Sequence, residues 1–377
     1  MPNLDLSIAK IMHGDTSVLR IMEGDTRVWP SGTDVAIDGI LTNVTSSISI
    51  PGSAALNSSL TITLTPNSSY IINQISITMD GVDITSTAYN DGIVTIASVT
   101  GDIIIHASAI EVITFEDVNV KAICVTNWGG NTITGEITPA EASIVTALNG
   151  VFRGNTTITK FNEFRYFTGI TTFTHPSSNP EQGEFYGCTK LEEITFPSIN
   201  IQQGDFRGLL RNCNKLKSVD LSPIVSNSYH INYMMYLSTS SVVEKVTLPG
   251  GYYGGGSGSL PYARYALRNC VNMTTLEIKG TADWSGISNY QEANAATSMF
   301  YRCDSLTNII GTITGIKNNL YMGQSPNLTH DSLLVIINGL ADLTGKTGKT
   351  LELHATAKAL LTADDIAIAT AKNWTIS

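Results

Sequence analysis

The chain is poor in several features that mark common classes of protein. Among its 377 residues only 22 are Lys or Arg, against 32 Asp or Glu, so the net charge is −10. A nucleic-acid groove needs a basic patch that neutralises phosphates, and anionic membrane surfaces also attract basic segments. No run approaches the roughly 20 apolar residues that span a bilayer. We therefore expect neither nucleic-acid binding nor membrane insertion.

The motifs of catalysis and metal binding are scarce as well. The histidines show neither HExxH nor any other ligand spacing, and no G-x-S-x-G elbow is present. A glycosidase needs two carboxylates that face each other across a cleft. Glu192 and Glu193 are neighbours on an expected strand, so they point to opposite sides and indicate a solvated surface. We predict that the protein is not an enzyme and holds no cofactor and no metal.

Two segments match ligand loops only in part. Residues 345–350 look like the end of a phosphate loop, but Leu340 and Leu343 stand where that loop needs a glycine. Residues 130–141 can be aligned with a calcium loop that ends at Glu141, yet its first three ligand positions hold Gly and Thr. We interpret the first segment as a turn between a helix and a strand. Residual calcium binding at the second stays an open alternative.

The few cysteines form the strongest pattern in the chain. The chain has five cysteines and no CxxC pair. Four of them share one motif, large apolar-x-x-Cys-x-x-apolar-x-x-apolar, and lie 25, 57 and 33 residues apart: Cys188, Cys213, Cys270 and Cys303. Residues 240–248 fill the long gap, with Ser240 in the cysteine position. We expect these cysteines, and Cys124, to be buried as small hydrophobic residues without disulfides.

A unit that recurs every 25–33 residues is typical of a solenoid, because one coil cannot bury its apolar edge alone. We predict coils over residues 151–324, the first with Asn155 in the cysteine position. Residues 325–377 change character, with helices capped by Thr329 and Thr362 and with short strands near residues 350–353 and 374–376. Because the end of a solenoid exposes apolar edges, we expect this α/β segment to cover one end.

The first 32 residues contain a direct duplication. Residues 10–19 and 20–29 each predict a short strand, a Gly-Asp turn and a second short strand. Isolated small hairpins are not stable in water. We therefore expect residues 1–32 to pack on a neighbouring segment, on another copy of themselves or on a larger assembly. The candidate anchor residues for attachment to such an assembly are Ile11, Met12, Ile21, Met22 and Trp29.

Residues 33–110 predict a small antiparallel β-sandwich. Apolar and polar residues alternate over residues 61–65 and 74–79, and Asp-Gly turns recur about every ten residues. Residues 111–150 are expected to be a connector that contains a helix capped by Thr138. The sequence as a whole predicts a mainly β fold.

An insert at residues 229–265 is rich in Tyr and Gly. Tyrosine offers a large contact area with a polar tip and loses little conformational entropy on binding. The candidate contacts for a glycan or a protein partner are Tyr229, Tyr233, Tyr252, Tyr253, Tyr262 and Tyr265. The alternative interpretation is that several of these rings pack between coils.

The cysteine motif resembles that of the BspA-like leucine-rich repeat family. Residues 113–170 resemble the leader that such repeats often carry, and residues 327–376 resemble their usual terminus. Residues 33–110 are similar to an Ig-like module of bacterial surfaces. The duplicated start resembles hairpin tags in virion proteins of gut bacteriophages. The resemblance implies a hairpin tag, an Ig-like sandwich, a connector, a leucine-rich-repeat solenoid and an α/β cap.

Modular proteins of this kind are bacterial surface adhesins or bacteriophage fibres and decoration proteins. Neither a signal peptide nor a sorting tail is visible, which favours the virion hypothesis. We expect a head or tail fibre or decoration protein, made in the host cytoplasm and placed at the virion surface. Its residues 1–32 would bind other virion proteins, and its solenoid would contact a host protein or glycan. Fibres are commonly homo-oligomers such as trimers. A bacterial adhesin is the alternative, and a depolymerase is a third.

Overall fold

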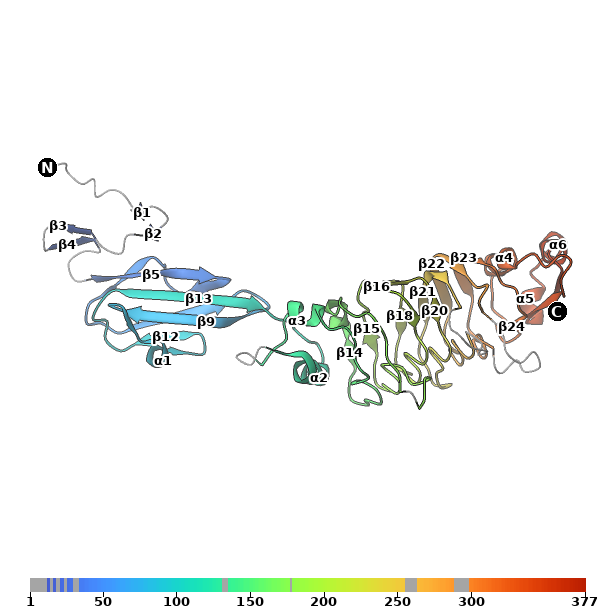
Figure 1. Cartoon of the computed structure of the whole chain (residues 1–377), viewed down its shortest axis with the longest axis horizontal. Helices are drawn as coiled ribbons and strands as arrows, with labels where there is room; N and C mark the ends of the chain where they lie inside the picture. Colours follow the sequence, from blue (N-terminus) through green and yellow to red (C-terminus); the bar gives the residue numbers. More distant parts are fainter. Residues whose placement is uncertain are drawn as a thin grey trace. The chain divides into compact units, whose positions relative to one another are not determined.

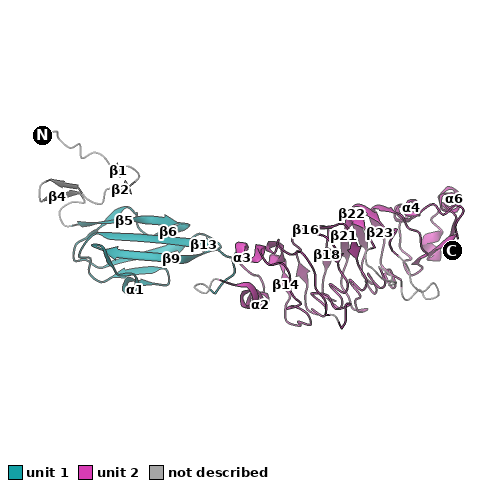
Figure 2. Cartoon of the chain, in the orientation of Figure 1, with its two compact units in different colours: residues 1–113, 131–138 teal, residues 114–130, 139–377 magenta. Residues whose placement is uncertain are grey.

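The computed structural model of the chain is mainly β, with several separate sheets (Figure 1). It describes residues 34–130, 135–176, 178–254, 263–287 and 298–377, together with the backbone of four short strands before residue 34. Figure 2 colours its two compact units: unit 1 comprises residues 1–113 and 131–138, and unit 2 comprises residues 114–130 and 139–377. The five-part division expected from the sequence stays a prediction.

The duplicated start forms two small hairpins. Strand β1 (Met12–His13) pairs antiparallel with β2 (Thr16–Ser17), and β3 (Ile21–Glu23) pairs antiparallel with β4 (Thr26–Trp29). The prediction of one hairpin in each copy is therefore confirmed.

Residues 34–111 form two sheets in unit 1. The first sheet has the order β10 (Val82–Asp83), β9 (Tyr70–Met79), β13 (Ile103–Glu111), β5 (Asp34–Thr42), β7 (Gly52–Ala55). The second has the order β11 (Tyr89–Asn90), β12 (Ile93–Ile96), β8 (Leu60–Pro66), β6 (Val44–Ser46). A short helix, α1 (Thr85–Ala88), follows β10.

The alternation seen in the sequence decides which side chains enter the core of unit 1. Ile62 and Leu64 from β8 are buried together with Ile77 from β9 and Ile105 from β13, so the two sheets share one apolar core. One expectation was wrong, since the sandwich is not wholly antiparallel: β5 and β13 pair in parallel, with Ile105 opposite Gly39. These are the first and last strands of the two sheets, and a long stretch of chain separates them, as parallel pairing requires.

Unit 2 begins with two helices. Helix α2 (Val118–Trp128) was not expected from the sequence, whereas α3 (Pro139–Ser143) confirms the helix predicted after Thr138. Asp117 is the N-cap of α2, and its Oδ1 accepts hydrogen bonds from the backbone N–H of Asn119 (2.8 Å) and Val120 (3.4 Å). Such a cap satisfies N–H groups that have no partner within the helix.

The strands of unit 2 pair only in parallel among the described residues. Figure 1 shows several of them following one another in chain order. The pairs and sheets are β14 (Lys160–Phe161) with β15 (Glu193–Ile194); β16 (Ile199–Ile201) with β19 (Ile224–Ser226); β17 (Gly204–Asp205) with β20 (Tyr229–His230); β18 (Ser218–Asp220), β21 (Lys245–Tyr252), β22 (Thr275–Asp283) and β23 (Asn308–Thr314); and β24 (Leu320–Met322), β25 (Lys349–Leu353) and β26 (Trp374–Ile376). A 3-10 turn, η1 (Asn162–Tyr166), follows β14.

The chain of unit 2 returns repeatedly to the same side of the unit, and we call each stretch between two such returns a pass. A column of backbone hydrogen bonds joins successive passes. From the second residue of the series onward, each N–H donates to the carbonyl of the residue before it in the series, at 2.7–3.3 Å. The series is Thr159, Glu192, Lys217, Glu244, Thr274, Thr307 and Thr329. At the start of the column, Oδ2 of Asp117 accepts the N–H of Thr159 at 2.6 Å. Asp117 therefore caps α2 and the first pass at once.

The repeated cysteines lie inside these passes, as predicted. All five cysteines are fully buried and free. The Sγ of Cys188 lies 3.1 Å from the carbonyl oxygen of Phe152 in the preceding pass, and the Sγ of Cys213 lies 3.0 Å from that of Phe185. Cys303 repeats the contact with Leu267 at 3.3 Å. Because a thiol is a weak donor, burial in an apolar slot is its main contribution.

The prediction for Ser240 was wrong. Ser240 is exposed, and the buried serine of this pass is Ser241, whose Oγ donates to the carbonyl oxygen of Asn269 at 2.9 Å. Backbone bonds align Met235 with the large apolar residue of the motif. Val243 follows Met235 by eight residues, whereas Leu216 follows Leu210 by six. Two additional residues in this turn therefore shift the motif.

The expected α/β segment closes the chain. Thr329 caps α4 (His330–Gly339), and Thr362 caps α6 (Ala363–Ala371) in a capping box with Asp365. The predicted strands are β25 and β26, and a further short helix is α5 (Ala355–Lys358). Residues 345–350 begin in the loop after α4 and end in β25, which confirms the expected order of helix, loop and strand.

Candidate functional site

One position of the passes in unit 2 alternates between arginine and tyrosine. The residue directly after this position donates its backbone N–H to the carbonyl oxygen at the same position of the next pass. These hydrogen bonds run from Gly154 to Tyr186, Gly187 to Arg211, Asn212 to Tyr236, Leu237 to Arg268, and Asn269 to Tyr301. The aligned residues are thus Arg153, Tyr186, Arg211, Tyr236, Arg268 and Tyr301. Neighbouring passes are ~4.8 Å apart, so this alignment places side chains in contact.

The guanidinium groups of Arg211 and Arg268 are held between tyrosine rings. The Cζ of Arg211 lies 4.9 Å from the ring centre of Tyr233, 5.2 Å from that of Tyr236 and 5.7 Å from that of Tyr186. The Cζ of Arg268 lies 4.9 Å from the ring of Tyr236 and 4.7 Å from that of Tyr301. These distances are within the range of cation–π attraction.

A second row of side chains completes the cluster. Tyr265 lies 4.9 Å from the ring of Tyr233 and 5.5 Å from that of Tyr236, and it also lies under Arg268 and Arg264. We call this set the Tyr–Arg column: Tyr186, Arg211, Tyr233, Tyr236, Arg264, Tyr265, Arg268 and Tyr301. All eight residues are partly exposed. Arg153 shares the backbone position, but its guanidinium donates to the carbonyls of residues 174, 182 and 183 instead.

Two tyrosines of the column have a left-handed backbone. The φ angles are 55° at Tyr233 and 58° at Tyr265, while Gly208 has φ 57° at the same position of the preceding pass. A bulky residue in this region is unusual, and such conformations cost on the order of 1 kcal/mol or more unless the surroundings impose them. The surrounding passes therefore hold these two backbones in place, and the rings of Tyr233 and Tyr265 pack against each other and against Tyr236.

The electrostatics of the column favour the neutral form of Tyr233. Glu181 accepts a hydrogen bond from Nη1 of Arg211 at 3.0 Å. Burial and the negative charge of Glu181 raise the pKa of Tyr233 to about 12. The Nε atoms of Arg211 and Arg264 are buried without a hydrogen-bond partner. Nη2 of Arg264 donates to the hydroxyl of Tyr265 at 3.2 Å.

A cluster of titratable side chains lies on the earlier passes of unit 2. Asp205 accepts a bidentate pair of hydrogen bonds from Arg207 at 2.9 and 2.7 Å, and His175 Nε2 lies 3.0 Å from Asp205 Oδ2. Burial opposes ionisation of Asp205, but His175 and Arg207 hold its pKa well below the usual range. His230 is opposite Asp205 in the β17–β20 pair, and burial lowers the pKa of His230 to about 4.

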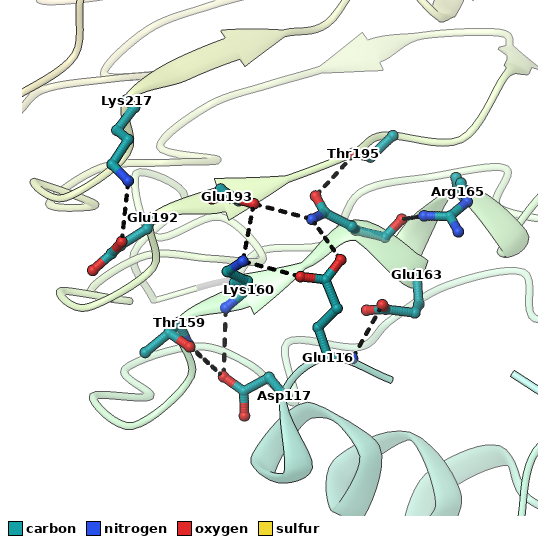
Figure 3. Close-up of polar contacts among 11 residues, drawn as sticks. Glu116, Asp117, Thr159, Lys160, Glu163, Arg165, Glu192, Glu193, Thr195 and Lys217 are labelled. Atoms are coloured by element: carbon teal, nitrogen blue, oxygen red, sulfur yellow. Dashed lines mark hydrogen bonds and ion pairs between the residues drawn. The ribbon is translucent and has the colours of Figure 1, made fainter. Parts of the chain in front are cut away.

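A second polar network surrounds β14 and β15, as Figure 3 shows. Lys160 Nζ lies 3.0 Å from a carboxylate oxygen of Glu116 and 3.5 Å from one of Glu193. The hydrogen bond from Lys160, and then one from Asn162, lower the pKa of Glu116. Lys217 lies 3.4 Å from Glu192.

An open cavity of about 350 Å³ lies beside this network and is lined by Asn162, Glu192, Glu193, Ile194, Thr195, Lys217 and Ser218. Its carboxylates are paired with lysines from neighbouring passes. We interpret the network as a charged surface that joins passes to one another.

The predicted contact tyrosines fall into three groups. Tyr233 and Tyr265 belong to the Tyr–Arg column, and Tyr252 is exposed, so these three stay candidates. The prediction was wrong for Tyr229 and Tyr253, which are buried and pack against each other in a tilted arrangement with ring centres 5.1 Å apart. Their hydroxyls donate to the carbonyl oxygens of residues 224 and 249, so neither ring can reach a ligand.

Some residues that the sequence predicted as contacts, anchors or ligands lie wholly or partly outside what the structure describes. Tyr262 and Ile11 are outside the described residues. Met12, Ile21, Met22 and Trp29 lie in the backbone strands before residue 34, and their side chains are not described, so the anchor stays a prediction. In the calcium-like segment, residues 131–134 are outside the described residues, and Glu141 Oε1 accepts the N–H of Gly130 at 3.1 Å.

Sequence reasoning missed most of the Tyr–Arg column, although a signal was present. The residue two before each repeated cysteine is always Tyr or Arg, namely Tyr186, Arg211, Arg268 and Tyr301. Tyr236 escapes this rule because its pass carries the two additional residues described above.

Compared with protein-family models and with curated proteins, the chain matches none. Within the described residues, no group of three or more His, Cys, Asp or Glu side chains is arranged to hold a metal ion. No helix in the described part of the chain is both long and apolar enough to cross a membrane.

Proposed function

We propose that the chain is a binding protein whose unit 2 is a leucine-rich-repeat solenoid that carries the Tyr–Arg column as its contact surface. Parallel pairing between passes, the backbone column from Thr159 to Thr329 and the buried cysteine slots support a solenoid. Repeats of this kind bury their own apolar edges and leave an extended outer surface for recognition.

The observation that carries the proposal is the Tyr–Arg column itself. Tyr and Arg are among the residues enriched where proteins bind partners, because both combine a flat apolar face with polar edges. Here five tyrosines and three arginines from successive passes are partly exposed and held in place by one another. A column that served packing alone would be buried, as Tyr229 and Tyr253 are.

We place this binding protein in a bacteriophage virion, as a fibre or decoration protein that is incorporated through residues 1–32. The two hairpins of the duplicated start support this part of the proposal, since short hairpins need a neighbour to be stable. Mass spectrometry of purified particles tests it. The full chain should be found in particles, and deletion of residues 1–32 should abolish incorporation. A chain that is never found in particles would refute the virion assignment.

A bacterial cell-surface adhesin is the second candidate. The two-sheet unit 1 favours it, because small β-sandwiches are common modules of surface proteins. Immunogold labelling of intact bacteria and of purified particles separates the two candidates by where the chain is found. In both cases the Tyr–Arg column makes the contact, so the purified protein should bind host cells. If replacing column arginines left cell binding unchanged, the column would not be the contact surface.

A further inference from the structure

The outer face of the first sheet of unit 1 carries an open cavity of about 440 Å³. Strands β5, β13 and β9 lie side by side in this sheet (Figure 1), and every second side chain of each strand points away from the core. A volume of this size lies within the roughly 300–1,000 Å³ of small-molecule sites. The outward side chains that line the cavity are Ile40, Thr42, Gln74, Ser76, His106 and Ser108.

The register of the strands sets these six side chains in two rows. Ile40 is opposite His106, and His106 is opposite Ser76, so these three form one row across the strands. Neighbouring strands are ~4.8 Å apart, and side chains two residues apart on one strand are ~7 Å apart. Side chains of both rows can therefore contact one small ligand. The second row, formed in the same way, holds Thr42, Ser108 and Gln74.

The imidazole of His106 is oriented by the neighbouring strand. Its Nδ1 accepts the backbone N–H of Ile40 at 3.1 Å, and no other group in the described part of the chain bonds to this ring. A ring nitrogen that accepts carries no proton, so the proton of the neutral ring is on Nε2. His106 is exposed and lines the cavity, so its Nε2–H can donate to a ligand.

The polar groups around His106 suit a ligand that carries hydroxyls. The hydroxyls of Thr42 and Ser76 can each donate and accept, as the hydroxyls of a sugar do. Ser108 Oγ lies 3.2 Å from Asn73 Oδ1 and 3.4 Å from Gln74 Oε1. The amide oxygen of Gln74 therefore faces Ser108, which leaves its NH₂ group as a donor.

The lining has no charge to pair with a charged ligand. In the described part of the chain it includes no Asp, Glu, Lys or Arg. The adjoining row holds Asp38, opposite Ile104, and its negative charge disfavours an anionic ligand. Ile40 is 66% exposed beside the His106 ring, so an apolar side chain stands next to a donor. A ligand with a methyl group beside a carbonyl oxygen matches that pair.

We infer that this face of unit 1 is a second binding site, which holds a neutral glycan by an N-acetylhexosamine residue. The acetamido group of such a sugar combines a methyl group with a carbonyl oxygen. The methyl group packs on Ile40, and the carbonyl oxygen accepts the Nε2–H of His106. The sugar hydroxyls bond to Ser76 and Gln74, and no covalent step takes part. This site lies on unit 1 and the Tyr–Arg column lies on unit 2, so the inference goes beyond the proposed function.

Saturation-transfer NMR of the full chain with the β-1,4-linked disaccharide of N-acetylglucosamine tests the inference, because the method reports which ligand protons contact the protein. Cellobiose has the same linkage with hydroxyls in place of the acetamido groups. The de-acetylated disaccharide, with charged amines, and an acetylated trialanine peptide are the other comparison ligands. One more hydrogen bond and one more buried methyl group should make the acetylated disaccharide bind about tenfold more tightly than each of the three. Its methyl protons should receive the largest saturation.

Variants locate the binding. Ile40→Ser removes the apolar contact, and His106→Asn keeps an acceptor for the Ile40 N–H but lacks the Nε2–H. Each should weaken binding of the acetylated disaccharide by about fivefold or more. Val82→Ser is the matched control for Ile40→Ser, since Val82 is 64% exposed in β10 of the same sheet and lies outside the cavity. It should bind as the unchanged chain does. Thermal unfolding of each variant separates lost binding from lost folding, and Ser76→Ala replaces a variant that unfolds unit 1.

Several results would overturn the inference. One is that cellobiose, the charged disaccharide or the peptide binds as tightly as the acetylated disaccharide, or that the latter does not bind at all. Another is that Ile40→Ser and His106→Asn, while folded, bind it unchanged. A third is that saturation falls mainly on ring protons and spares the methyl groups. None of these results bears on the Tyr–Arg column, which is tested by the binding of host cells.

Discussion

Cysteine placed at position 240 or at position 241 tests how the irregular pass of unit 2 is built. Ser240 is exposed, whereas Ser241 is fully buried and donates to the carbonyl oxygen of Asn269. The five native cysteines are buried, and burial raises the pKa of Cys270 and Cys303. We therefore expect the native chain to show no thiol that reacts with a water-soluble disulfide reagent at pH 7.

The magnitude follows from what exposure of a buried thiol costs. A thiol that reacts only after unfolding is protected by the free energy of unfolding, which is at least about 5 kcal/mol for a typical domain. At 1.36 kcal/mol for each factor of ten, Ser241→Cys should react at least about a thousandfold more slowly than Ser240→Cys. Ser241→Cys should also change the free energy of unfolding by no more than about 1 kcal/mol, since the thiol keeps a weak donor in place.

The assay is thiol titration of the folded chain, followed by the same titration in denaturant, where every variant shows six thiols and the native chain five. Ser240→Cys should give one fast thiol per folded chain, and Ser241→Cys should give none. Equal rates for the two variants would refute the two-residue shift and the burial of Ser241.

Three further perturbations test other parts of the account. Asp117→Ala should lower the free energy of unfolding of unit 2 by roughly 3 kcal/mol, because it removes the cap of α2 and the hydrogen bonds to the first pass. The control is Asp364→Ala at an exposed helix start, which should change that free energy by under about 0.5 kcal/mol. Denaturant titration measures both. Burial lowers the pKa of His230 in the folded chain to about 4, below its ordinary value of 6.5. The stability that the neutral form of His230 contributes is therefore present above pH 6.5 and is lost as the pH falls towards 4, by up to about 3 kcal/mol. A glutamine variant whose stability falls just as steeply in that window would contradict this. Gly39→Ala should destabilise unit 1 by about 2 kcal/mol or more, because a Cβ at position 39 would collide with the backbone of Ile105, while unit 2 should unfold as before. An unchanged unfolding curve for unit 1 would disprove the close approach of β5 and β13.

Much of the fold could be predicted because local patterns decide it. Alternation in β8 placed Ile62 and Leu64 in the core, and the recurring cysteine motif placed Cys188 and Cys213 inside the passes. Thr329 and Thr362 cap their helices as expected, since a cap depends on residues within one turn. The parallel pairing of β5 with β13 was not predictable in this way, because it joins segments far apart in the sequence.

The site was harder to predict because it depends on which residues align between passes. Tyr229 and Tyr253 are as rich a signal in the sequence as Tyr233, yet they lie one behind the other in the core. Tyr236 joins the column only once the two additional residues before Val243 are known. Composition indicated a contact surface of tyrosines, and only the alignment of passes separates the buried rings from the partly exposed ones.

The most direct measurement of the central claim is a crystal structure of the full chain. The account predicts that the passes of unit 2 hold the guanidinium groups of Arg211 and Arg268 against the ring of Tyr236, with all three side chains partly exposed. Passes of unit 2 that do not bring these three side chains together, or that bury them, would contradict it.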